Sequence, residues 1–62
     1  MSISEFYNKT IGGNGVIVYV HDGENVVDEY KLYAVWSYQF AKYANCEITF
    51  FDFENNAVYI QM

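Results

Sequence analysis

Short apolar runs alternate with turn-forming residues along the whole chain, and the first run has helical spacing. Apolar residues recur at helical intervals over residues 2–11, where Ser2 and Glu5 form the Ser-x-x-Glu pair of a capping box. This pattern predicts a short amphipathic helix that ends at Gly12. The glycine-rich run 12–15 precedes a strand and opens no helix, so we interpret it as a connector, not a nucleotide-binding loop.

Two later segments have the composition of β-hairpins. A strand is predicted over 16–21, because residues 16–20 are all β-branched or aromatic, and an Asp-Gly pair follows at the predicted turn. The same type of sequence predicts a strand over 46–53, a turn over 54–56 and a last strand over 57–61.

The segment between the hairpins has two interpretations. One long helix over 25–44 would make the order of elements α-β-α-β-β. We favour a strand over 26–33, because the run is rich in Val and Tyr, which are mediocre helix formers. A short helix over 35–44 would then follow. In this interpretation Glu29 and Lys31 point outward and Tyr30 and Leu32 inward, and the core side of the helix carries Trp36, Phe40, Ala41 and Ala44.

The predicted fold is a single α+β domain over residues 1–62. It has a small antiparallel sheet of about four strands with one or two short helices, and the version with the long helix stays open. Strand alternation divides the sheet into two faces, and both are apolar. One face collects Val16, Val18, Val20, Ile48, Phe50, Val58 and Ile60; the other collects Ile17, Tyr19, Thr49, Phe51, Phe53 and Tyr59.

The second apolar face needs a cover. The first helix is short, so we expect that helix, a second copy of the chain or a different protein to shield the face. Thirteen residues are Phe, Tyr or Trp, and Cys46 is the only cysteine, so no intrachain disulfide forms. A chain of 62 residues without such a staple depends on dense aromatic packing or on burial against a partner.

The charge balance excludes some classes of partner. Three Lys and no Arg face eight acids, a composition unsuited to binding nucleic acid directly. No stretch approaches the length of a membrane span, and no signal peptide is visible. The lone thiol agrees with a reducing compartment, so we expect a cytoplasmic protein.

Candidate catalytic and metal-binding groups are few. His21, Asp22 and Glu24 share one turn but lack the rest of a calcium loop. Asp52 and Glu54 flank the second turn, where solvated carboxylates are the expected interpretation. Cys46 lies among apolar residues without a nearby His in the sequence, as an inert thiol does. We therefore predict no enzyme, no metal and no cofactor.

The acids and aromatics together suggest a protein-binding surface with an aromatic centre and one or two negative rims. The predicted contacts to a basic protein complex are Tyr19, Asp22, Glu24, Asp28, Glu29, Trp36, Phe51, Asp52, Glu54 and Tyr59. In size, acidity, the segments VIVYVHDGENVVDEY and FDFENN, and its lack of catalytic residues, the chain resembles the small acidic anti-CRISPR and other anti-defence inhibitors that phages encode. The resemblance implies a stoichiometric inhibitor that blocks a nucleic-acid-binding or catalytic surface, in the host cytoplasm. The alternative is a small homodimeric structural or accessory subunit.

Overall fold

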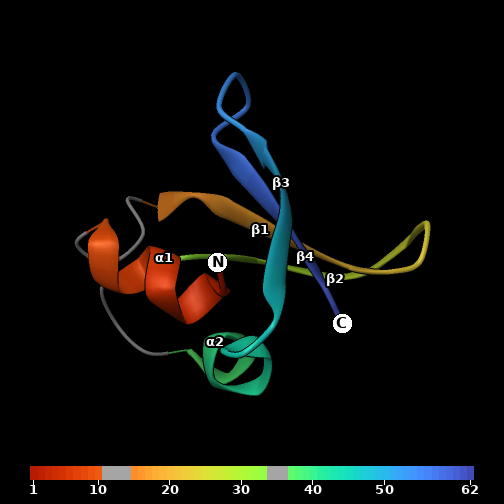
Figure 1. The fold of residues 1–62 in the computed structure, drawn as a ribbon, viewed down its shortest axis with the longest axis horizontal. Coiled ribbons are helices and arrows are strands. Elements are labelled where there is room, and N and C mark those ends of the chain that lie inside the picture. Colours follow the sequence, from red (N-terminus) through yellow and green to blue (C-terminus); the bar gives the residue numbers. More distant parts are fainter. Residues whose placement is uncertain (11–14, 34–36) are drawn as a thin grey trace.

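A helix precedes each of two β-hairpins along the chain (Figure 1). The structure is a computed structural model that describes residues 1–10, 15–33 and 37–62. Its elements are α1 (Ile3–Lys9), β1 (Ile17–Asp22), β2 (Asn25–Lys31), α2 (Tyr38–Tyr43), β3 (Glu47–Asp52) and β4 (Ala57–Gln61). The predicted small α+β fold is confirmed, and the strand β2 rules out the long helix over 25–44.

Serine side chains cap the N-termini of both helices. Ser2 Oγ accepts the Glu5 N–H at 3.2 Å while the Ser2 N–H donates to the Glu5 carboxylate at 3.1 Å, which is the predicted capping box. The Ser37 hydroxyl accepts the Phe40 N–H at 3.0 Å and begins α2 later than the sequence pattern indicates. Helix α2 is shorter than predicted because its cap fixes a later start, whereas α1 has the predicted cap and ends earlier, at Lys9.

The four strands form one mixed sheet in the order β2-β1-β4-β3. The two hairpins are antiparallel, as expected, but the central strands β1 and β4 are parallel, so the prediction of an entirely antiparallel sheet is wrong. The physical reason is the connection between them. β1 already pairs with β2 through a tight turn, and β4 reaches the other side of β1 only after α2 and β3. A connection of that length permits parallel pairing.

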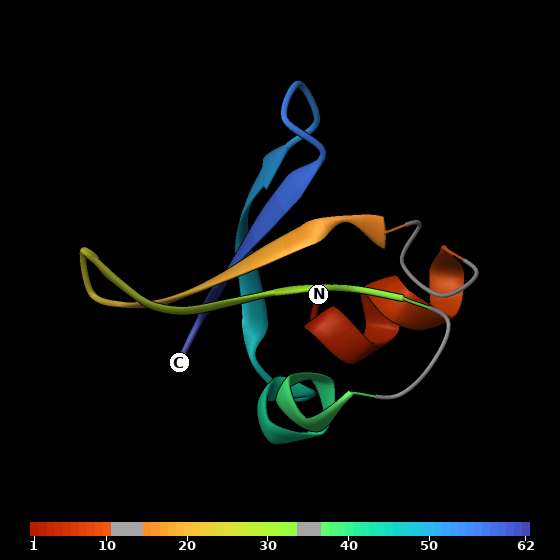
Figure 2. The ribbon, with the colours of Figure 1, turned by 180° about the vertical axis from the view of Figure 1, so that it is seen from behind.

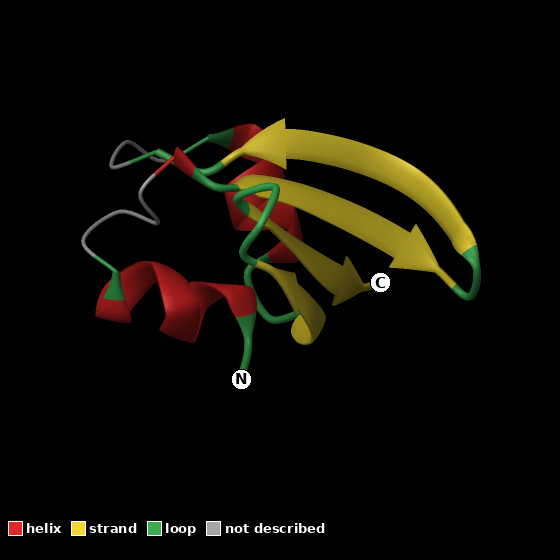
Figure 3. Cartoon of the chain, turned by 90° about the horizontal axis from the view of Figure 1, so that it is seen from above, coloured by secondary structure: helices red, strands yellow, loops and turns green. Residues whose placement is uncertain are grey.

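Both helices pack against the same face of the sheet. The core contains Ile3, Val16, Val18, Val20, Tyr30, Leu32, Phe40, Tyr43, Val58 and Ile60. The Tyr7 and Phe40 rings lie 4.6 Å apart between centroids, so α1 and α2 are neighbours, as Figures 1 and 2 show. Seen from above in Figure 3, the β1–β2 hairpin extends well away from α1.

Some predictions for the core are correct and others are not. Tyr30 and Leu32 are buried and Glu29 and Lys31 exposed, as expected. The predicted inward position of Ala41 is wrong, because Ala41 is exposed. The α2 positions that reach the core are Phe40 and Tyr43, which lie three residues apart and therefore on one side of the helix. Ala44 is half-buried, and Trp36 lies outside the described residues.

A β-bulge in β3 reverses the predicted faces of two aromatic residues. The register with β4 shifts between Ile48 and Phe50, so Phe50 pairs with Tyr59 and Phe51 pairs with the buried Val58. The inward placement of Phe50 and the outward placement of Phe51 are therefore wrong. The extra residue at the bulge moves every later side chain of the strand to the other face.

The hydroxyl of Tyr30 is buried without a hydrogen-bond partner among the residues that the structure describes. Burial, with smaller effects of Cys46 and Asp28, raises the pKa of the Tyr30 hydroxyl above its ordinary value. The folded state thus keeps this proton at pH values where the unfolded chain has lost it. Stability therefore falls once the pH exceeds the ordinary tyrosine pKa of about 10.

Replacing Tyr30 with Phe tests whether this hydroxyl is unpaired in the folded protein. Because the hydroxyl makes no bond, Tyr30→Phe should leave the free energy of unfolding at neutral pH unchanged or raise it by up to about 1 kcal/mol. The advantage should grow in alkaline solution, measured by urea denaturation at both pH values. The exposed Tyr38→Phe is the control and should change neither value. A loss above about 1 kcal/mol at neutral pH would contradict the assignment.

Candidate protein-binding surface

The sheet face opposite the helices carries a row of aromatic side chains. Strand pairing aligns Glu29, Tyr19, Tyr59 and Phe50 in one row across β2, β1, β4 and β3. We call this side of the sheet the open face, because no described helix packs on it. Its aromatic row occupies three adjacent strands, which makes it a continuous apolar strip.

The rings of this row contact one another. Tyr19 and Tyr59 are stacked with centroids 5.0 Å apart, and Phe50 is tilted against Tyr59 at 5.8 Å. Both tyrosines are half-buried, whereas Phe50 is 58% exposed. The two tyrosines shield each other, but Phe50 presents its ring to solvent. A partly exposed, mutually packed aromatic cluster is typical of a binding surface.

Beside this row, His21 joins β1 to β3 through side-chain hydrogen bonds. Its Nδ1 lies 2.9 Å from the Gly23 carbonyl oxygen and its Nε2 lies 2.7 Å from Thr49 Oγ1. A carbonyl only accepts, so Nδ1 carries a proton and donates it. The Thr49 Oγ1 atom also lies 3.3 Å from the Tyr59 carbonyl oxygen. His21 is thus a bridging residue, and the described residues contain no group of three potential metal ligands.

The β3–β4 hairpin carries aromatics on its other side as well. Phe51 lies on the helix side of the sheet, 5.9 Å from Phe6 between ring centroids, and remains 37% exposed. Phe53 stacks on Phe51 at 5.6 Å and is 82% exposed. The tip of this hairpin projects beyond the helices (Figure 1), so the first helix covers this side of the hairpin only in part.

The acidic residues of the two hairpin turns form two separate groups. Because β1 and β4 are parallel, the turns of the two hairpins lie at opposite ends of this central pair. Asp22 and Glu24 are exposed at one end, and Glu54 is exposed at the other. Asp52 accepts hydrogen bonds from the backbone and side-chain nitrogens of Asn55 at 3.3 and 2.9 Å, and so holds the second turn. Of the one or two acidic rims that the sequence allows, this topology favours two acidic ends, one at each hairpin turn.

Asp28 has a structural position that the sequence did not indicate. One carboxylate oxygen accepts the Glu29 N–H at 2.8 Å and the other accepts the Tyr43 hydroxyl at 2.9 Å. The Lys42 ammonium lies over the Tyr43 ring, 5.3 Å from its centroid. Asp28 therefore ties β2 to α2, and both of its oxygens are engaged within the chain.

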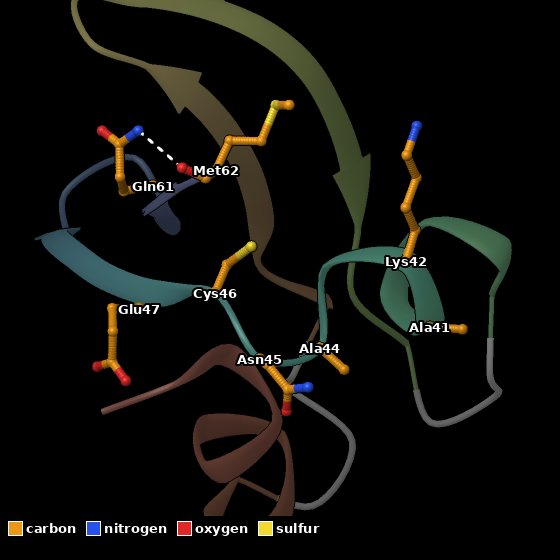
Figure 4. A pocket seen from close by; sticks show the side chains of 8 residues that line it. All are labelled: Ala41, Lys42, Ala44, Asn45, Cys46, Glu47, Gln61 and Met62. Carbon is orange, nitrogen blue, oxygen red and sulfur yellow. Dashed lines mark hydrogen bonds between the residues drawn. The ribbon is translucent and has the colours of Figure 1, made fainter.

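An open hollow of about 390 Å³ lies where the end of α2 meets the start of β3 (Figure 4). It is lined by Ala41, Lys42, Ala44, Asn45, Cys46, Glu47, Gln61 and Met62. Burial raises the pKa of the Cys46 thiol above its ordinary value, so the thiol stays protonated at neutral pH. The charged side chains of the lining have other partners: the Glu47 carboxylate pairs with the Met1 ammonium at 2.9 Å, and the Lys42 ammonium lies over the Tyr43 ring. The lining contains no histidine.

The structure brings together only part of the predicted contact set. Tyr19, Tyr59 and Glu29 share the open face, whereas Phe51 lies behind it and Trp36 lies outside the described residues. Phe50 is the residue that the sequence pattern failed to place on this face. Alternation could not have found it, because adjacent phenylalanines fit either register and only the bulge decides between them.

Comparisons with protein-family models, curated proteins and solved structures give no match to this chain. Among the described residues, no helix has the length and apolar character required to cross a bilayer. The geometry of the open face therefore provides the basis for a functional proposal.

A double-mutant cycle tests the link between Asp28 and Tyr43. Tyr43→Phe removes a hydrogen bond to a carboxylate and should lower the free energy of unfolding by about 1 kcal/mol. In Asp28→Ala, which lacks an acceptor, the same substitution should cost clearly less, which urea denaturation measures as a coupling energy. The exposed turn residue Asp22 supplies the control, and Asp22→Ala should show no coupling to Tyr43. Additivity within about 0.3 kcal/mol for the first pair would contradict the bond.

Proposed function

We propose that this protein is a non-enzymatic inhibitor that docks its open face onto a basic protein surface and thereby blocks nucleic acid from that surface. The observation that carries the proposal is the aromatic row formed by Tyr19, Tyr59 and Phe50 on a sheet face without a described helix. Aromatic residues at the centre of a contact supply most of the binding energy of typical protein interfaces.

Charge defines the chemistry of the partner. The net charge is −5, and the two acidic ends flank the open face with Asp22 and Glu24 on one side and Glu54 on the other. Docking two copies face to face would bring like charges together, which opposes association. A partner with an apolar centre and flanking Lys or Arg side chains complements both features, and its positive charges would also speed the encounter.

The proposed blocking of nucleic acid follows from the phosphate-binding chemistry of basic protein surfaces. Clusters of Lys and Arg large enough to match two acidic ends are the groups that neutralise phosphates. An acidic chain that occupies them competes with nucleic acid for the same charges. Inhibition of a host defence or other nucleic-acid-handling complex in the cytoplasm, as the resemblance to anti-CRISPR proteins implies, is the biological form of this proposal.

The β3–β4 hairpin offers a matched pair of variants for testing the contact surface. Phe50→Ser and Phe53→Ser each remove one exposed phenylalanine from the same hairpin, but only Phe50 belongs to the open face. Each variant and the unchanged protein would serve as bait for affinity capture from the native host lysate. The captured complex would then be purified and its DNA or RNA binding measured with increasing inhibitor.

The expected result is a basic complex that the unchanged protein and Phe53→Ser hold with similar affinity. Its nucleic acid should be displaced stoichiometrically, and Phe50→Ser should bind at least about tenfold more weakly. Equal loss in both variants would contradict the open face as the contact. Capture without displacement of nucleic acid would contradict the inhibitory mechanism.

The acidic ends generate a separate prediction about salt. The double variant Asp22→Asn with Glu24→Gln should bind the captured complex more weakly, because charges that complement the partner are lost. Its affinity should also depend less on ionic strength, since fewer charge pairs remain to be screened. Titrations at several salt concentrations measure both effects. Unchanged affinity together with an unchanged salt slope would show that these acids take no part in the contact.

A further inference from the structure

Strand β2 leaves one edge of the sheet unpaired among the described residues. The strand order places β2 outermost, and its pairing with β1 covers only its inner side. The Leu32 N–H donates to the Val16 carbonyl at 2.9 Å, so even-numbered residues of this segment direct their peptide groups at β1. In an antiparallel pair the alternate residues face away, and the peptide groups of Glu29 and Lys31 therefore point outward.

The other edge of the sheet is protected. At the start of β3, the Ile48 N–H donates to the Met1 carbonyl at 2.8 Å and Ser2 forms a bridge with Glu47. The bulge before Phe50 then interrupts the strand. Bulges and covering segments are ordinary means of preventing edge-to-edge pairing. β2 also has a bulge, at Val27, but its edge from Asp28 to Lys31 is regular and no described segment covers it, so this stretch is the one available for strand addition.

We propose that β2 pairs antiparallel with β2 of a second copy, about a two-fold axis at Tyr30. In this register Glu29 lies opposite Lys31 of the second copy, and by symmetry Lys31 lies opposite its Glu29. Cross-strand pairs of opposite charge stabilise antiparallel sheets. A shift of the axis to Glu29 would set Glu29 against its own copy, and a shift to Lys31 would set lysine against lysine. Only the register at Tyr30 pairs opposite charges.

The same register also matches apolar residues near the ends of the contact. Val27, at the bulge of β2, and Tyr33, two residues beyond the strand, then lie near each other at the ends of the contact; they are 51% and 56% exposed in the single chain. In the single chain, the outward-pointing Glu29 N–H donates a hydrogen bond to the Asp28 carboxylate. In the pair, this N–H donates instead to the Lys31 carbonyl of the second copy. Pairing thus breaks one intrachain hydrogen bond and forms a ladder of backbone hydrogen bonds between the two copies.

Pairing at the edge leaves the open face uncovered. Residues directly opposite each other in a sheet point to the same side, so both open faces lie on one side of an eight-stranded sheet. The two aromatic rows then form one larger docking surface. The pairing itself does not rest on the proposed inhibitory function, and it is measured on the purified protein alone.

Charge reversal and its rescue test the pairing. Sedimentation from micromolar to millimolar concentration should show a reversible dimer of the unchanged protein. Glu29→Lys and Lys31→Glu should each weaken it by at least about tenfold, because each variant creates two like-charge pairs. The double variant with both changes restores opposite charges and should return to within about threefold of the original affinity. The control Glu24→Lys makes the same change in charge at the turn and should leave the dimer intact.

The outcomes separate the pairing from other arrangements. A protein that stays monomeric up to millimolar concentration would overturn the proposal. A dimer that the single reversals leave unchanged, or that the double variant fails to restore, would place the contact elsewhere and also overturn it. Thermal unfolding of each variant by circular dichroism shows that lost dimerisation does not come from lost folding, since both substituted positions are exposed.

Discussion

The parallel pairing of β1 with β4 at the centre of the sheet fixes where the other parts of the molecule lie. Each of these strands begins or ends a hairpin, and parallel alignment sends the two hairpin turns to opposite ends. The acidic residues of the turns are separated for the same reason. Both helices pack on one side of the sheet, where Ile3, Phe40 and Tyr43 complete the core.

The described residues cover one face of the sheet. The two helices, of seven and six residues, carry enough side chains to cover one face of the four-stranded sheet. The open face remains apolar because Tyr19 and Tyr59 stack there, and the bulge in β3 adds Phe50 to them. Small domains commonly gain stability by burying such surfaces against another chain. Both proposed contacts, at the open face and at the β2 edge, follow from this shortage of covering structure.

The local patterns predicted the elements well, because local interactions determine them. The capping box at Ser2, the strand over Ala57–Gln61 and the inward side chains of Tyr30 and Leu32 depend on neighbours within a few residues. The parallel central pair and the bulge depend on contacts between distant segments, which no periodicity in the sequence records. The bulge explains why aromatic residues occupy both faces of the last hairpin. Phe50 belongs to the exposed strip, while Phe51 rests against Phe6.

Exposure of the aromatic row to solvent is the central claim, and NMR measures it directly. A soluble paramagnetic agent broadens ring protons according to their distance from solvent. The ring signals of Phe50 should broaden strongly and those of Tyr19 and Tyr59 to an intermediate degree, while those of Phe40 and Tyr43 stay sharp. If the three rings of the open face were as protected as Phe40 in the monomeric protein, that face would be covered by its own chain and unable to dock onto another.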